Sequence, residues 1–121
     1  MVPLYQRKAE FFRMLGHPVR IRVLELLGDG PMPVRDLLAD IAIEASSLSQ
    51  QLAVLRRAGI VTSTRGEGGT VTYALAGPDI ADLMRAARSF LTQMLTGQAE
   101  LLDELREDPA RADPRLESLS V

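Results

Sequence analysis

Two short runs rich in β-branched residues, 60–65 and 71–75, stand out from a chain whose other apolar residues recur at helical spacing. The segment between them, Gly-Glu-Gly-Gly-Thr at residues 66–70, contains the glycines that a hairpin loop needs for positive φ angles. We therefore expect one small β-hairpin in a mainly α fold. Its place after several helical segments restricts the fold more than any other feature of the sequence.

Five segments have the periodic apolar residues of amphipathic helices. They are expected at about residues 3–15, 18–27, 33–41, 45–58 and 78–105. Gly16 and Gly59 follow the first and fourth segments as C-caps, and Pro18 suits a first helical turn. The last segment predicts a helix of about 27 residues, roughly 40 Å long at 1.5 Å per residue. A domain of this size does not need so long a helix to cover its own core, so an apolar face is left for a partner.

The order of helix, short turn, helix and hairpin is that of a winged helix-turn-helix, in which the second helix of the turn enters the DNA major groove. Here that recognition helix spans about residues 45–58. At 100° per residue, Leu48, Leu52 and Leu55 lie on one side, and the opposite side is small and polar, which allows close approach to base edges. The predicted DNA-binding residues are Ser46, Ser47, Ser49, Gln50 and Arg57 in this helix, and Arg65 and Thr70 in the wing at residues 64–70.

Two of these features also have a simpler explanation. Ser47 and Gln50 match the capping box, in which a serine N-cap and a glutamine three residues later satisfy each other's backbone groups. Arg65 and the wing glycines are also what a plain, solvent-exposed hairpin contains. Both explanations stay open beside the interpretation as DNA contacts.

Two long stretches carry a family resemblance. They are residues 12–27, Phe-Arg-Met-Leu-Gly-His-Pro-Val-Arg-Ile-Arg-Val-Leu-Glu-Leu-Leu, and residues 47–61, Ser-Leu-Ser-Gln-Gln-Leu-Ala-Val-Leu-Arg-Arg-Ala-Gly-Ile-Val. With them the chain resembles the ArsR/SmtB family of bacterial repressors over residues 7–95. The resemblance implies a dimeric repressor that leaves its operator when an inducer, often a metal ion, binds. It also implies that the polar residues of the fourth helix face the groove and that Arg65 lies in the wing.

The resemblance further implies a homodimer built from the first and last helices, with two recognition helices in successive major grooves of a palindromic operator. The surplus apolar faces lie on these two helices. The predicted interface residues are Leu4, Phe11 and Phe12 in the first helix and Leu83, Ala87, Leu91, Met94, Leu95 and Leu102 in the last. Residues 1–108 then form the DNA-binding and dimerisation domain, and residues 109–121, which contain two prolines, form a mobile tail.

The donors with which many such repressors sense metals are missing. The chain has no cysteine and one histidine, His17, whose Gly-His-Pro setting favours a structural role over metal ligation. Acidic residues from Glu100 to Asp108 recur three or four apart and could hold a hard cation, but a solvated acidic face explains them more simply. We expect no metal and no cofactor. The regulatory input is then a small molecule between the long helices, a sensing partner protein, or protein concentration alone.

The net charge of −2 is unusual for a DNA-binding protein. Residues 1–75 carry nine basic and seven acidic residues, whereas residues 76–121 carry five and nine. A protein-interaction module, or a co-regulator that needs a partner to bind DNA, is therefore the alternative function. An enzyme is not expected, because no nucleophile–histidine–acid set or phosphate loop is visible. A cytoplasmic location is expected, since no apolar run of roughly 18 residues and no secretory pattern occur.

Overall fold

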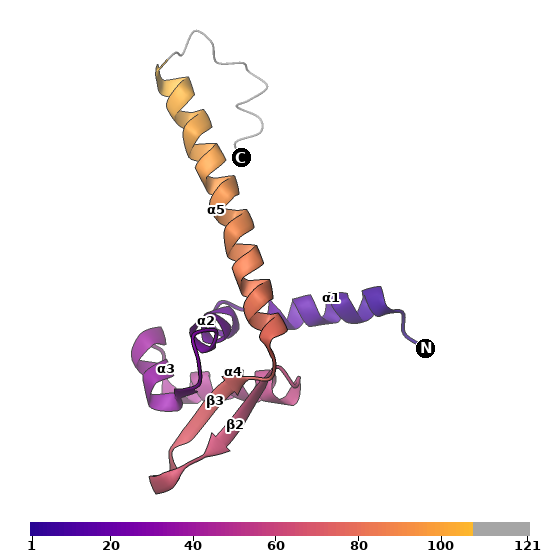
Figure 1. Cartoon of the computed structure of the whole chain (residues 1–121), viewed down its shortest axis with the longest axis vertical. Coiled ribbons are helices and arrows are strands. Elements are labelled where there is room, and N and C mark those ends of the chain that lie inside the picture. The colour runs from indigo at the N-terminus through magenta and orange to yellow at the C-terminus, as the bar shows by residue number, and fades with distance from the viewer. Residues whose placement is uncertain (108–121) are drawn as a thin grey trace. The chain divides into compact units, whose positions relative to one another are not determined.

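Residues 1–107 are described by a computed structural model, which divides into two units (Figure 1). The first unit, Met1–Met84, contains most of the secondary structure, and the described part of the second unit is the rest of the last helix from Arg85 onward. The predicted tail at residues 109–121 lies outside the described residues. In chain order the elements are α1 (Leu4–Leu15), α2 (Pro18–Leu27), β1 (Met32–Pro33), α3 (Val34–Ile41), α4 (Ala45–Arg57), β2 (Val61–Arg65), a 3₁₀ turn (Glu67–Gly69), β3 (Val71–Leu75) and α5 (Pro78–Glu107).

The predicted helices are all present, with boundaries that follow local capping. α4 ends in a Schellman motif, because the N–H of Gly59 donates to the carbonyl of Arg56 and the N–H of Ile60 donates to the carbonyl of Leu55. Gly59 has a φ of 78°, which glycine adopts without strain. This arrangement agrees with the C-cap predicted at that glycine. α5 has 30 residues, slightly more than expected.

The sheet of the described residues has three antiparallel strands in the order β1-β3-β2, whereas the sequence predicts only the two strands of a hairpin. β2 and β3 form that hairpin. β1 adds only Met32 opposite Tyr73 and Pro33 opposite Thr72. A strand of two residues is too short to show a period of two. Pro33, predicted to begin a helix, instead lies in this edge strand, where the missing backbone N–H is tolerated. α3 consequently begins at Val34, one residue later than predicted.

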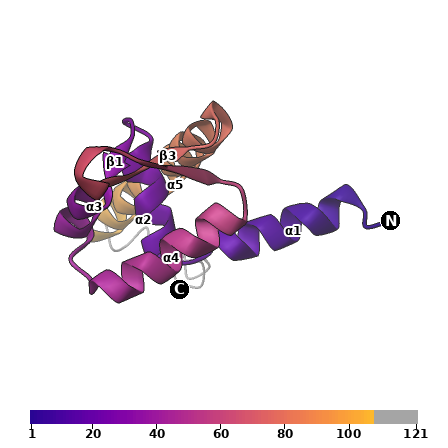
Figure 2. The ribbon, with the colours of Figure 1, turned by 90° about the horizontal axis from the view of Figure 1, so that it is seen from below.

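The hydrophobic core lies within the first unit, where α2 packs against α3, α4 and β3. Among the described residues, its eleven buried members are all apolar or aromatic, and no buried side-chain polar atom lacks a partner. Figure 2 shows α4 running along one edge of this unit. The core residues are Leu15, Val23, Leu24, Leu27, Leu37, Leu48, Leu52, Leu55, Ile60, Val61 and Tyr73.

The first turns of α5 belong to the first unit and contribute to this core. Ile80, Leu83 and Met84 pack against the core of the first unit, but none of the residues of α5 is fully buried. None of the helices in residues 1–107 combines the length and apolar character needed to cross a membrane.

Candidate nucleic-acid interface

The turn between α3 and α4 is only three residues long, Ala42 to Glu44. Ala42 has a φ of 56° and a ψ of 48°, in the left-handed region, and its N–H donates to the carbonyl of Leu38, so it ends α3 abruptly. Glu44 is extended and accepts the first α4 hydrogen bond, from the N–H of Leu48. The two helices therefore form the helix-turn-helix pair that the sequence predicts, with α4 as the second helix.

α4 has one buried and one exposed side. Leu48 and Leu55 are 0% exposed and Leu52 is 2% exposed. The residues predicted to contact DNA lie away from these leucines, on the surface of the unit: Ser46, Ser47, Ser49, Gln50 and Arg57 are all exposed. The structure thus brings five of the seven predicted DNA-binding residues together along one helix.

The capping-box interpretation of Ser47 is wrong. α4 begins at Ala45 and its N-cap is Glu44, so Ser47 is the third residue inside the helix. Glu44 itself makes no side-chain capping hydrogen bond. The first N–H groups of α4 therefore receive no help from the N-cap side chain, and the positive end of the helix dipole lies beside Ser46 and Ser47.

The wing is the loop between β2 and β3. Its tip is a 3₁₀ turn in which Gly68 and Gly69 have φ angles of 70° and 78°, and the N–H of Gly66 donates to the carbonyl of Thr70 at 2.8 Å. Arg65 is exposed at the end of β2, whereas Thr70 is partly buried. Glu67 is exposed at the tip, so the wing carries one cation and one anion within three residues.

Two arginines of α2 contact the helix-turn-helix pair, one on α3 and one on α4. Arg22 pairs with Asp40 of α3 at 3.1 Å. Arg20 donates from Nε to Oε1 of Gln51 in α4 at 2.7 Å, and from Nη1 to the carbonyl of Met14 in α1 at 2.7 Å. Sequence reasoning missed the role of Arg20, because Gln51 lies 31 residues away and no local spacing indicates the pair.

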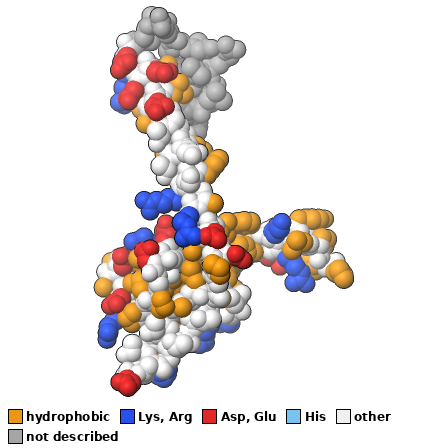
Figure 3. Space-filling model, in the orientation of Figure 1, with side chains coloured by type: hydrophobic (Ala, Val, Ile, Leu, Met, Phe, Trp, Pro, Cys, Tyr) orange, Lys and Arg blue, Asp and Glu red, His pale blue; other side chains and the backbone are white. Residues whose placement is uncertain are grey.

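The predicted dimer residues differ in how far their own unit covers them. On α1, Leu4 and Phe12 are exposed, at 66% and 55%, but Phe11 packs against the core. Leu83 of α5 also packs against that core. The others on α5 are exposed, as is Phe90, which is not among the predicted residues. Figure 3 shows apolar side chains at the surface of α1. The exposed predicted residues of α5 are Ala87, Leu91, Met94, Leu95 and Leu102.

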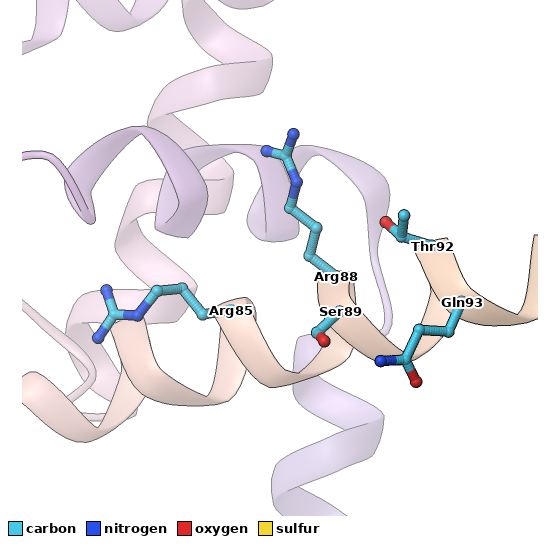
Figure 4. Close-up of a pocket in the computed structure, with 5 residues that line it drawn as sticks. All are labelled: Arg85, Arg88, Ser89, Thr92 and Gln93. Atoms are coloured by element: carbon cyan, nitrogen blue, oxygen red, sulfur yellow. The ribbon is translucent and has the colours of Figure 1, made fainter. Parts of the chain in front are cut away.

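A second face of α5 is polar. Arg85, Arg88, Ser89, Thr92 and Gln93 line a shallow surface hollow on this helix (Figure 4). The lining residues supply two guanidinium groups, two hydroxyls and one amide. Farther along α5, the described carboxylates of residues 100, 103, 104 and 107 are exposed.

The histidine has a local structural task. The Nδ1 atom of His17 accepts a hydrogen bond from the N–H of Val19 at 3.1 Å, so His17 caps α2, whose first residue is Pro18. Within residues 1–107 no group of three or more histidine or acidic side chains is arranged to hold a metal ion. Asp108, the last of the acidic residues considered above, lies outside the described residues.

The helix pair α3–α4, the three-stranded sheet and the glycine-tipped loop define a winged helix-turn-helix protein. A family model described as a helix-turn-helix domain matches residues 15–64. The chain belongs to the ArsR/SmtB family of DNA-binding transcriptional repressors, whose members are regulators and not enzymes.

The similarity extends over most of the chain. The chain is 50% identical over 105 residues to the HTH-type transcriptional regulator Rv0081 of Mycobacterium tuberculosis, and the match covers 86% of this chain and 91% of that protein. The crystal structure of Rv0081 matches with a TM-score of 0.73 at 49% identity, covering 82% of this chain and 99% of the other. The transcriptional repressor SmtB homolog of Synechocystis is 34% identical over 88 residues, 73% of this chain and 66% of that protein. The crystal structure of the transcriptional repressor BigR from Xylella fastidiosa matches with a TM-score of 0.67 at 34% identity, covering 71% of this chain and 87% of the other.

Proposed function

We propose that this chain represses transcription as a homodimer on a palindromic operator, with one α4 helix in each of two major grooves about 34 Å apart. The observation that carries the proposal is the division of α4 into two sides. Leu48, Leu52 and Leu55 are at most 2% exposed, while Ser46, Ser49 and Gln50 are exposed on a helix that follows a three-residue turn. A helix so anchored can enter a groove without losing core contacts.

The exposed side of α4 suits both phosphates and bases. The helix begins beside Ser46 and Ser47 without a side-chain cap, and helix N-termini favour phosphate oxygens. Gln50 can form two hydrogen bonds to adenine, and Ser49 can donate to or accept from any base edge. The short serine side chains allow a close approach between the phosphate walls. We therefore assign base reading to Ser49 and Gln50 and backbone contact to the two preceding serines.

The remaining predicted contacts are electrostatic. Arg57 is the last residue of α4 and is exposed, and Arg65 is exposed at the base of the wing. In a winged fold these guanidinium groups lie near the sugar–phosphate backbone or the minor groove. Thr70 is partly buried, so its contribution is limited to a backbone contact at the end of the loop.

The dimer is supported by exposed apolar residues on α1 and α5, among them Leu4, Phe12, Leu91 and Leu95. Apolar patches of this kind on a monomer mark interaction surfaces. A second copy of the chain offers the same patches, so a symmetric contact is self-complementary. Two-fold symmetry in the protein then requires a palindromic operator.

A selection of genomic fragments with the purified protein, followed by fluorescence anisotropy on a selected duplex, tests the proposal. We expect the double substitution Ser49→Ala and Gln50→Ala to abolish the preference for the selected duplex over a scrambled one while the dimer stays intact. Thr92→Ala with Gln93→Ala removes the same kinds of group from exposed positions of α5 and is the matched control. An unchanged preference in the α4 variant would contradict the assignment of base reading.

A protein-interaction module is the second candidate, and the charge distribution favours it. The chain has a net charge of −2, and Glu67 is exposed at the tip of the wing. Such a protein would bind DNA only weakly without a partner. The fragment selection would then yield no preferred duplex, and any binding measured by anisotropy would not depend on Ser49 or Gln50.

A further inference from the structure

The guanidinium group of Arg20 connects three helices. Arg20 belongs to α2, its Nε donates to Oε1 of Gln51 in α4, and its Nη1 donates to the carbonyl of Met14 in α1, with both distances 2.7 Å. The side chain is partly buried, as is that of Gln51. Because the guanidinium is planar and rigid, two short bonds from the same group fix the directions of both partners.

The contact with α1 lies at the C-terminal end of that helix, which favours a cation. Met14 is the second-last residue of α1, so its carbonyl has no partner in the ordinary helical pattern. The negative end of the helix dipole also lies there. Arg20 therefore satisfies a carbonyl that α1 leaves open, and this bond holds its guanidinium in place for the contact with α4.

The contact with α4 restrains the rotation of that helix about its own axis, which apolar contacts alone restrain less. Leu48, Leu52 and Leu55 hold α4 against the core, but apolar contact has no preferred direction and tolerates a small rotation of the helix about its axis. A hydrogen bond weakens steeply when its angle changes. Gln51 directly follows Gln50 and lies 100° away around the helix, so fixing Gln51 also fixes the direction in which Gln50 leaves the helix.

We propose that Arg20 is the positioning residue of the recognition helix, and that its bonds to Gln51 and to the Met14 carbonyl set the rotation of α4 on which operator preference depends. The proposal rests on the proposed function, since it assumes that α4 reads DNA. Arg20 acts through Gln51 and does not touch the DNA itself.

The test is a double-mutant cycle on the full-length protein, measured as Kd for a selected operator and for a scrambled duplex of the same length. We expect Arg20→Ala and Gln51→Ala each to weaken operator binding about tenfold to a hundredfold, because each removes a hydrogen bond to a charged group. The double variant should be no worse than either single variant. Binding to the scrambled duplex, and its salt dependence, should not change.

Two further variants separate this role from a general structural one. Gln51→Glu keeps an acceptor for Arg20 and should retain operator preference, whereas Gln51→Ala should lose it. Arg22→Ala removes an equal charge from the same helix, but its partner Asp40 lies on α3, so it is the matched control. The two Gln51 variants, Gln51→Glu and Gln51→Ala, keep Arg20 itself. Comparing them therefore still tests the proposal if Arg20→Ala fails to fold.

Several results would overturn the inference. Additive losses in the cycle would mean that the two side chains act independently. Equal losses on both duplexes, with a shallower salt dependence, would mean that Arg20 contacts phosphate directly. If the wild-type protein has no operator preference, the proposed function fails. If the wild type has the preference and Arg20→Ala keeps it, only the positioning role fails.

Discussion

Arg22 of α2 donates two hydrogen bonds to the same carboxylate oxygen of Asp40 in α3, at 3.2 Å from Nε and 3.1 Å from Nη2. The two side chains are 48% and 38% exposed, so water and salt screen the charges. Exposed ion pairs contribute about 0–1 kcal/mol. The pair therefore orients α3 against α2 more than it stabilises the fold.

We accordingly expect Asp40→Asn to lower the free energy of unfolding by less than about 1 kcal/mol in urea titrations, with a smaller difference at high salt. Glu10→Gln is the control, because Glu10 is exposed in the middle of α1, away from both ends of that helix. This variant should show no measurable change. A loss of about 3 kcal/mol in Asp40→Asn, the range of a broken buried pair, would show that the pair is shielded from solvent.

Leu52 illustrates how the two sides of α4 separate stability from recognition. Its side chain is 2% exposed among core residues, so Leu52→Ala should cost about 2–5 kcal/mol through lost burial and the cavity left behind. Ser49→Ala, on the exposed side, should change stability by no more than about 0.5 kcal/mol. Urea denaturation of both variants checks this. Equal losses would contradict the burial pattern of the helix.

The period of apolar residues was enough to predict most of the fold. Leu48, Leu52 and Leu55 recur at helical spacing, and the structure buries all three. Gly59 marks the end of α4 because only the left-handed region satisfies the final carbonyls there. These features depend on a few neighbouring residues, so a local pattern can identify them.

The features that could not be predicted depend on residues far apart in the chain or on very short segments. β1 pairs Met32 with Tyr73 across 41 positions, 32 to 73, and has no periodicity of its own. Gln51 meets Arg20 only after the chain has folded. An apolar stripe also does not reveal what covers it: Phe11 and Leu83, which stay predicted interface residues, are partly buried against the core of their own unit.

Gly59 provides a test of backbone strain without steric clash. A Cβ at this position would meet nothing within 4 Å, so the cost of Gly59→Ala comes from the φ of 78° alone. We expect a loss of about 1–2 kcal/mol in the free energy of unfolding. Gly77 also has open space around its Cβ position and does not have a positive φ, which makes Gly77→Ala the matched control. Thermal unfolding in which both variants match the wild type would argue against the Schellman motif.

Arg65 allows the wing to be tested separately from α4. If each wing neutralises one phosphate, Arg65→Ala should make the slope of log affinity against log salt shallower by about 0.9 per subunit, or about 1.8 per dimer. Operator preference should survive, because a phosphate contact carries no sequence information. Anisotropy titrations at several salt concentrations measure both. Arg106→Ala, an exposed arginine in the last turn of α5, is the charge control. A lost preference with an unchanged slope would instead assign Arg65 to base reading.

Leu95 tests the dimer on which the spacing of the two recognition helices depends. The side chain is 60% exposed on α5, so an aspartate there is tolerated by an isolated subunit. In a dimer that buries this face, the same carboxylate would lose its hydration without gaining a partner. We therefore expect Leu95→Asp to shift sedimentation velocity from dimer to monomer and to weaken operator binding by removing one half-site contact.

Ser89→Asp introduces the same charge on the polar face of the same helix and should leave the dimer intact. Circular dichroism should show both variants folded, because neither position belongs to the core of the first unit. A Leu95→Asp protein that sediments as a dimer would move the interface away from this part of α5. A wild-type protein that sediments only as a monomer would remove the basis for a palindromic operator, because one recognition helix can address only one half-site.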